Sequence, residues 1–290
     1  MSRMGDVLAG NHAVWEFHSD SVLIRFERGI RTPRLWAALG QRRVPYEALA
    51  GATVTPGKRD TVVLRAEPRP GADPLVEAAA GQLKESCDPY RLVLPADRAA
   101  LAGELARQLR DALGPVPDEP VNRFLVAVPE APVQFKGYDA KASFDGTAVT
   151  LRWSRTGAST TKWRAGDQYL PVAELGGVEW RTPEAPGGHL RLLRREGPGA
   201  GARTAEPDQD PATVLFGTGS GAVHESLPFA AAVLRAVRSR GPALPVAAVR
   251  PRSDPADIAD RIRHLGELHS AGLLTDDEFT SKKAELLAQL

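Results

Sequence analysis

Hydrophobic and polar residues alternate in two stretches of the chain that align without gaps. Residues 11–26 read NHAVWEFHSDSVLIRF, and residues 138–153 read YDAKASFDGTAVTLRW. Each stretch contains a short alternating strand, a polar turn and a second alternating strand, which is the pattern of a β-hairpin. The two hairpins share identical residues at four aligned positions, which in the first stretch are Ala13, Phe17, Val22 and Arg25.

The correspondence continues further along the chain. Residues 42–56 (RRVPYEALAGATVTP) correspond to residues 168–183 (QYLPVAELGGVEWRTP), and alternating strands follow at 61–65 and 190–194. Several elements in the same order and at nearly the same spacing predict a tandem duplication of one domain.

Each copy then has apolar residues at helical spacing. Leu101, Leu105 and Leu109 recur every four residues in the first copy, as do Phe229, Val233 and Val237 in the second. An amphipathic helix can cover the open end of a curved antiparallel sheet and bury its apolar residues. The pattern therefore predicts a mainly β fold with helices, in which two tandem β-barrels or sheets like pleckstrin-homology (PH) domains are each closed by a C-terminal helix. A simple α+β sandwich is the alternative.

Proline-rich connectors divide the chain. One contains the apolar run FLVAV and is expected to be a partly ordered linker, with residues 124–128 lying on one of the domains. The other carries four prolines within fifteen residues, which favours an extended spacer. The predicted parts are a first PH-like repeat at 8–114, a linker at 115–134, a second repeat at 135–241, a proline-rich linker at 242–253 and a helical tail at 254–290.

The tail has the pattern of a two-helix hairpin. Gly272 ends the first helix, and Thr275 with Glu278 forms a capping box for the second. Two helices this short have too small a core to be stable alone, so their apolar stripes must be buried on a partner. Self-association is the simplest solution, and docking on the parent domain or on another protein is the alternative. The residues expected to form the oligomer contact are Ile258, Ile262, Leu265, Leu268, Leu273, Leu274, Phe279, Leu286, Leu287 and Leu290.

The tail resembles the SHOCT (short C-terminal) domain family, which has a leucine-stripe helix, then G-[LI]-[IL]-T-x-x-E-F, then paired lysines and leucines. The resemblance implies oligomer assembly or partner contact and no catalytic role. The tandem repeat resembles a domain-of-unknown-function family found as paired copies in actinomycete proteins, through the motifs AxWEF, RRVPYEALAG and DPYRLVLP. That resemblance implies a PH-like fold without a defined activity.

Composition restricts the function classes. Lys plus Arg number 37 against 36 Asp plus Glu, and this balance argues against nucleic-acid binding. The single cysteine, Cys87, cannot form an intrachain disulfide, and neither a signal-peptide pattern nor a stretch of about 18 apolar residues occurs. We therefore expect a cytoplasmic protein.

The sequence contains no recognisable catalytic pattern. The glycine-rich GTGSG at 217–221 is followed by AVHESL, which reads as a strand and favours a hairpin turn over a phosphate-binding loop. The six histidines are not spaced as metal ligands, and no GxSxG elbow is present. We expect no enzyme activity, no metal and no cofactor.

The best candidate ligand surface lies in the first repeat. Trp36 and Trp163 occupy corresponding segments that read as loops flanked by basic residues, and arginines cluster around Trp36. Such a cluster could bind an anionic lipid, peptide or polymer. The alternative is a solvated basic rim that packs against the acidic tail. The candidate residues are Arg28, Arg31, Arg34, Trp36, Arg42 and Arg43.

The leading hypothesis is a non-enzymatic interaction and assembly protein that forms a homo-oligomer through its tail and could also hold a protein partner. The second hypothesis is peripheral binding to anionic lipid through the basic loop of the first repeat.

Overall fold

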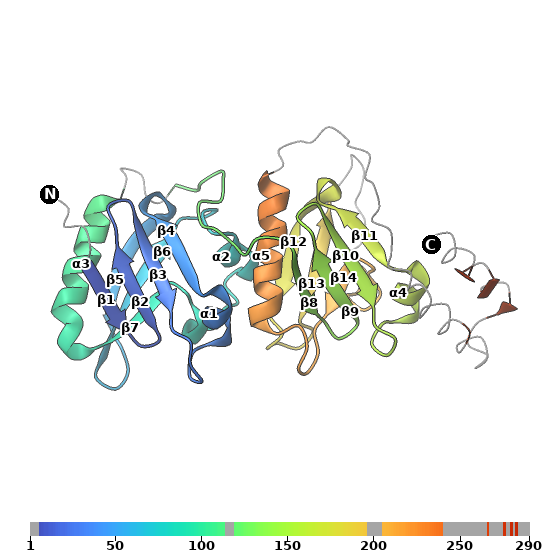
Figure 1. Ribbon diagram of the computed structural model, residues 1–290, viewed down its shortest axis with the longest axis horizontal. Coiled ribbons are helices and arrows are strands. Elements are labelled where there is room, and N and C mark those ends of the chain that lie inside the picture. The colour runs from blue at the N-terminus through green and yellow to red at the C-terminus, as the bar shows by residue number, and fades with distance from the viewer. Residues whose placement is uncertain are drawn as a thin grey trace. The chain divides into compact units, whose positions relative to one another are not determined.

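The structure is a computed structural model that describes residues 6–113, 119–195 and 205–239, and a few residues of the tail. The chain divides into two compact units, residues 1–244 and 245–290. The first unit contains both repeats, and its elements are labelled in Figure 1.

The first repeat begins with a four-stranded antiparallel meander in the order β1-β2-β3-β4. Residues in β2 alternate as the sequence predicts, with Ala13, Trp15 and Phe17 buried and the residues between them half-buried. A short helix, α1, connects β3 to β4. The elements are β1 (Asp6–Gly10), β2 (Ala13–Phe17), β3 (Ser21–Phe26), α1 (Arg34–Leu39) and β4 (Gln41–Pro45).

A second sheet, in the order β5-β6-β7, and a C-terminal helix complete the first repeat. The helix α3 buries Ala102, Leu105, Ala106 and Leu109, which are spaced as one face of a helix. A short helix, α2, lies between β6 and β7. The elements are β5 (Leu49–Pro56), β6 (Thr61–Pro68), α2 (Pro74–Ala79), β7 (Arg91–Pro95) and α3 (Ala99–Ala112).

The second repeat has the same order of elements, with a four-stranded sheet, a three-stranded sheet and a helix. The described residues between its last two strands, 195 and 205–212, contain no helix corresponding to α2. Its elements are β8 (Val133–Lys136), β9 (Ala140–Phe144), β10 (Ala148–Trp153), α4 (Thr160–Ala165), β11 (Gln168–Pro171), β12 (Leu175–Arg181), β13 (His189–Arg194), β14 (Thr213–Leu215) and α5 (Val223–Ser239). Single turns of 3-10 helix occur at Tyr46–Ala48, Glu85–Cys87, Ala96–Arg98 and Val172–Glu174.

A shared irregularity supports the duplication. The pairing of β5 with β6 shifts register between Leu49 and Gly51, and the pairing of β12 with β13 shifts between Leu175 and Gly177. These positions are the ones aligned by sequence, so both copies have a β-bulge at the same place.

The prediction of a mainly β fold with helices is confirmed. The strands of the described residues form four separate antiparallel sheets, and none of these sheets closes into a barrel. No helix among those residues is long and apolar enough to cross a bilayer.

The linker contacts the cores of both repeats. Val126 is 2 % exposed and belongs to the core of the first repeat, whereas Phe124 and Val128 pack against the buried cluster that contains the core of the second repeat. The sequence predicted that residues 124–128 lie on one domain, and the structure shows them in contact with both.

Two sequence-based assignments are wrong. Trp36 and Trp163 lie on the short helices α1 and α4, where the sequence suggested loops. The GTGSG segment does form a tight turn, in which the amide of Ser220 donates to the carbonyl of Gly217 (3.0 Å), but Val223 then begins helix α5 and no strand follows. The hydroxyl of Ser226 bonds back to the carbonyl of Gly221 (2.8 Å), which fixes the first turn of that helix.

Candidate functional site

The structure separates the six residues of the predicted basic cluster. Arg28, Arg31 and Arg34 are exposed, the first two in the loop between β3 and α1 and the third at the start of α1. Arg43 is exposed on β4, but it lies opposite Leu23 and donates to the hydroxyl of Ser21 (2.7 Å), at the other end of β3. Trp36 and Arg42 are buried.

Trp36 is a core residue of the first repeat. It is 3 % exposed, and its ring lies 5.2 Å from that of Phe26. Its indole nitrogen donates to the carbonyl of Cys87 (3.0 Å), so its one polar group is satisfied inside the fold. The expectation that Trp36 contributes to a ligand surface is therefore wrong, because an aromatic ring at this position on a short helix points into the core.

The expectation that Arg42 lies on the ligand surface is also wrong, because its guanidinium is part of a buried polar cluster. Its Nη2 donates to Asp73 (2.8 Å), and the hydroxyl of Tyr90 donates to the other carboxylate oxygen of Asp73 (2.7 Å). Asp73 also caps helix α2 by accepting from the amide of Leu75 (2.9 Å). The cluster therefore links β4, α2 and the residue preceding β7.

Burial and charge shift the pKa values in this cluster. Burial raises the pKa of Tyr90 well above its ordinary value, and the carboxylate of Asp73 raises it further. Burial alone would lower the pKa of Arg42, but the charge of Asp73, the nearby Tyr90 and the hydrogen bond to Asp73 together outweigh burial and raise the pKa. Both groups therefore keep their protons, which is the state that a structural hydrogen-bond network requires.

The second repeat contains a different buried pair. Lys162 on α4 is fully buried, and its Nζ donates to Asp139 (2.5 Å) and to the carbonyl of Thr213 (2.7 Å). Burial lowers the pKa of Lys162 and raises that of Asp139, and the attraction between the two opposes both shifts. Because Trp36 corresponds to Trp163, Lys162 occupies the position of the apolar Leu35 in the first repeat. The copies differ inside their cores as well as on their surfaces.

The most extensive contact between the repeats involves helix α5. Leu35, Leu75, Ala78 and Ala79 of the first repeat belong to the same buried cluster as the apolar residues of α5. Gln82 adds polar contacts by donating to the carbonyl of Trp180 and accepting from the amide of Thr182. The two repeats thus share one apolar core around α5.

An arginine near the end of α5 strengthens this contact. Arg238 pairs with Glu77 of α2, donates to the carbonyl of Gly71 (3.4 Å) and lies 4.1 Å above the ring of Phe124. When the buried faces of α3 and α5 are aligned, Arg238 corresponds to Arg110. Arg110 instead donates to the carbonyl of Ala52 on the adjacent strand of its own repeat (2.6 Å).

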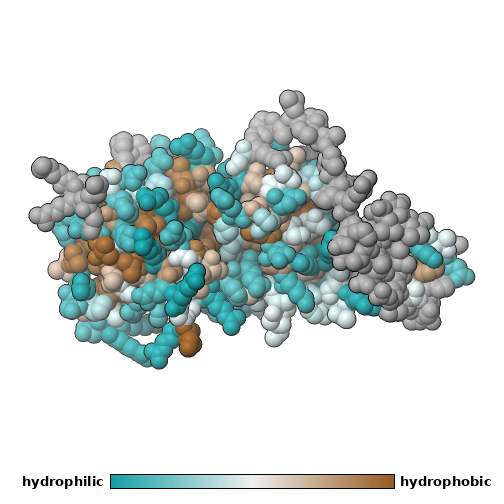
Figure 2. All heavy atoms as spheres, viewed as in Figure 1, coloured by the Kyte–Doolittle hydropathy of each residue, from teal (hydrophilic) through white to brown (hydrophobic). Residues whose placement is uncertain are grey.

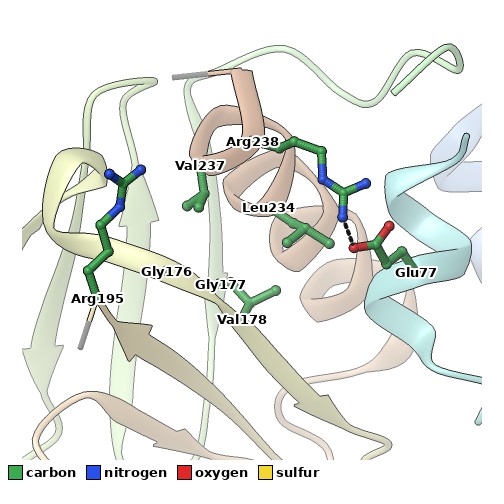
Figure 3. Close-up of a pocket in the computed structure, with 8 residues that line it drawn as sticks. All are labelled: Glu77, Gly176, Gly177, Val178, Arg195, Leu234, Val237 and Arg238. Atoms are coloured by element: carbon green, nitrogen blue, oxygen red, sulfur yellow. Dashed lines mark hydrogen bonds and ion pairs between the residues drawn. The ribbon is translucent and has the colours of Figure 1, made fainter. Parts of the chain in front are cut away.

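A pocket of about 410 Å³ lies beside Arg238. Figure 3 shows Arg195 and Arg238 on opposite sides of it, with Leu234, Val237 and Val178 between them. Val178 corresponds to Ala52, so the pocket occupies the place that Arg110 covers in the first repeat. Within the described part of the chain, Arg238 pairs with Glu77 and does not cover this end of β12.

The chemistry of the pocket is limited. The described residues that line it have two guanidinium groups, one carboxylate and apolar side chains, and none of them carries a hydroxyl, thiol or imidazole. The carboxylate, Glu77, is paired with Arg238. The lining therefore offers no nucleophile with an adjacent base, which covalent catalysis requires.

Across residues 6–113, 119–195 and 205–239, no group of three or more His, Cys, Asp or Glu could hold a metal ion. Cys87 is a free, half-buried thiol.

Most of the expected oligomer residues lie outside the described residues. These are Ile258, Ile262, Leu265, Leu268, Leu273, Leu274, Leu286, Leu287 and Leu290. Phe279 is described, is half-buried in a helical segment and has the ammonium of Lys283 5.6 Å from its ring centre.

Comparison with known families agrees with this architecture. A family described as a domain of unknown function (DUF4429) matches residues 15–110 and 142–234, one match in each repeat. The chain therefore belongs to the DUF4429 family, with two copies of its domain. The short C-terminal domain (SHOCT) matches residues 260–287. Neither family carries an enzymatic signature, and a search of curated proteins found no match.

Proposed function

We propose that this protein is a non-enzymatic assembly protein, in which two fused repeats form a binding platform and the SHOCT tail joins several chains. The observation that carries the proposal is the shared core around α5, which includes Leu35 and Leu75 from the first repeat. A shared apolar core holds two domains in a fixed relation, as a platform for a partner requires.

We also propose that each repeat is a PH-like domain. A four-stranded meander, a three-stranded meander and a closing helix occur twice in the same order. In the first repeat α3 buries Leu105 and Leu109 in the core that both sheets share. This arrangement supports the PH-like assignment over a simple α+β sandwich.

Physical argument favours self-association of the tail. The stripe residues Ile262, Leu265 and Leu287 fall within the SHOCT match. A two-helix hairpin buries too little apolar area to offset its conformational entropy. Every chain carries the same apolar stripe, so a symmetric contact between tails buries the stripe of each chain.

The test is the mass of the protein in solution. Light scattering after size-exclusion chromatography should give a multiple of the chain mass of 31.1 kDa for the full chain and the single-chain mass for a chain ending at residue 253. The double variant Leu265→Asp and Leu287→Asp should also give single chains, because a charge in a buried stripe is costly. A matched control, Thr280→Asp, introduces the same charged side chain at an exposed position of the tail and should keep the assembled mass. A full chain that already runs as a single chain would overturn the proposal and favour docking of the tail on its own platform or on another protein.

A further inference from the structure

The loop between β3 and α1 combines an exposed apolar tip with positive charge. Ile30 has a relative exposure of 107 %, the largest among the exposed large apolar side chains of the described residues. Arg28 and Arg31 flank it in the loop, Arg34 begins the following helix, and all three are exposed. Figure 1 shows this loop projecting beyond the sheets of the first repeat, and Figure 2, in the same view, shows a hydrophobic projection bordered by hydrophilic surface at that edge.

Contacts at its base hold the loop in place. The amide of Glu27 donates to the carbonyl of His12 (2.9 Å), and the amide of Thr32 donates to the carbonyl of Gly29 (3.1 Å). Thr32 is 6 % exposed, and Leu35 and Trp36 anchor the helix that follows. The exposure of Ile30 therefore belongs to a closed turn with both ends fixed in the core.

We propose that this loop inserts into the surface of an anionic lipid bilayer. Ile30 would enter the boundary between headgroups and acyl chains, while Arg28, Arg31 and Arg34 contact lipid phosphates. An apolar side chain flanked by cations matches the two layers of such a surface, one apolar and one negatively charged. Glu27 offsets one positive charge, which leaves two net positive charges at the tip of a chain whose overall charge is +1.

The shape of the loop favours a membrane over a protein partner. A stable protein interface buries about 800 Å² on each side around an apolar centre of several residues. Here one isoleucine projects among arginines, and its apolar neighbours Leu35 and Trp36 are already buried. A bilayer requires no such matched surface, because it deforms around a single inserted side chain.

The second repeat has no exposed apolar tip at the corresponding loop. Its corresponding segment, residues 154–159, reads SRTGAS and has no large apolar residue. The described residues of each chain therefore carry one such insertion loop, and single-chain binding should be weak. The site itself does not depend on assembly, but its apparent affinity does, because chains joined by their tails would bring several loops to one membrane.

The test uses the full chain and vesicles of phosphatidylglycerol with phosphatidylcholine, compared with vesicles of phosphatidylcholine alone. The chain should sediment with the anionic vesicles only. Ile30→Ser should weaken binding by about tenfold or more, from the lost burial of the side chain. Replacing Arg28, Arg31 and Arg34 by Gln should weaken it by about a hundredfold and reduce its salt dependence.

Matched variants separate the loop from general charge and hydrophobicity. Val7→Ser removes another exposed apolar side chain of the same repeat, which is 55 % exposed, and should leave binding unchanged. A triple variant at Lys58, Arg98 and Arg123, all changed to Gln, removes the same charge from other exposed positions and should have little effect. Ile30→Trp should retain binding, since tryptophan suits the membrane interface.

Three results would overturn the proposal. These are no sedimentation with anionic vesicles, an Ile30→Ser variant that binds vesicles as tightly as the parent, and control variants whose vesicle binding weakens as much as that of the loop variants. A chain ending at residue 253 keeps this test distinct from that of assembly. It should bind more weakly if the tail assembles chains, yet show the same ratio between parent and Ile30→Ser.

Discussion

Truncation of Leu75 tests whether the two repeats unfold as one body. Leu75 lies on α2 of the first repeat, is 0 % exposed and belongs to the buried cluster around α5 of the second. Leu75→Ala removes three carbon atoms, which contribute about 2.4 kcal/mol of transfer free energy at about 0.8 kcal/mol each. The cavity left behind brings the expected loss in free energy of unfolding to about 3 kcal/mol, within the usual range for a buried leucine.

Urea unfolding followed by two probes measures this loss. For a slope of about 3 kcal/mol/M, the midpoint should fall by about 1 M. Tryptophan fluorescence should report one transition, and hydrogen exchange should show lower protection in both α3 and α5. The matched variant Val76→Ala, on the same helix but 36 % exposed, should lose less than about 1 kcal/mol. If the loss for Leu75→Ala is as small as that for Val76→Ala, or if α5 keeps its protection, the repeats do not share a core.

Two further predictions concern the buried polar groups. The pKa of Tyr90 in the folded protein is raised above its ordinary value of 10.0. Above pH 10 the unfolded state therefore releases the Tyr90 proton while the folded state keeps it. The contribution of Tyr90 to stability is complete below pH 10 and is lost as the pH rises above 10. The free energy of unfolding should fall by up to about 1.4 kcal/mol per pH unit in that window, and Tyr90→Phe should reduce this slope; an unchanged slope would contradict the assignment. Asp139→Ala should cost about 3–5 kcal/mol in urea unfolding at pH 7, because it leaves the buried ammonium of Lys162 without a carboxylate to balance its charge. The double variant Asp139→Ala with Lys162→Met should recover part of that loss, and a double variant no more stable than the single would count against the pair.

The repeat and its strands could be predicted from the sequence because alternation is a local signal. Trp15 and Phe17 lie on either side of Glu16, and both are buried where the alternation places them. Strand β3 departs from the alternation, because Ser21, Val22, Leu23 and Ile24 are all buried. The closing helices were predictable for the same reason, since Leu105 and Leu109 recur at helical spacing and are buried. Leu101, the third residue of that predicted stripe, is 39 % exposed.

The candidate ligand surface could be predicted only in part. The arginines of the loop are exposed as expected, but Arg42 and Trp36 are buried because of partners far away in sequence, Asp73 and the carbonyl of Cys87. No local pattern shows that an arginine on a strand will meet a helix-capping aspartate 31 residues later. The exposed tip Ile30 was missed for a related reason, because an isolated apolar residue in a polar loop carries no periodic signal.

The closing helices of the two repeats have different surfaces, so the order of the repeats along the chain matters. On α5, Ala231 and Ala232 are buried, whereas the corresponding part of α3 carries Glu104, which is exposed and paired with Arg107. The first helix therefore faces water with charge, and the second faces a neighbour with small apolar residues. If the two halves of the gene were exchanged, the charged face would meet a protein surface and the apolar face would meet solvent. The two copies share a fold, but the surface of each closing helix suits only one position of its repeat in the chain.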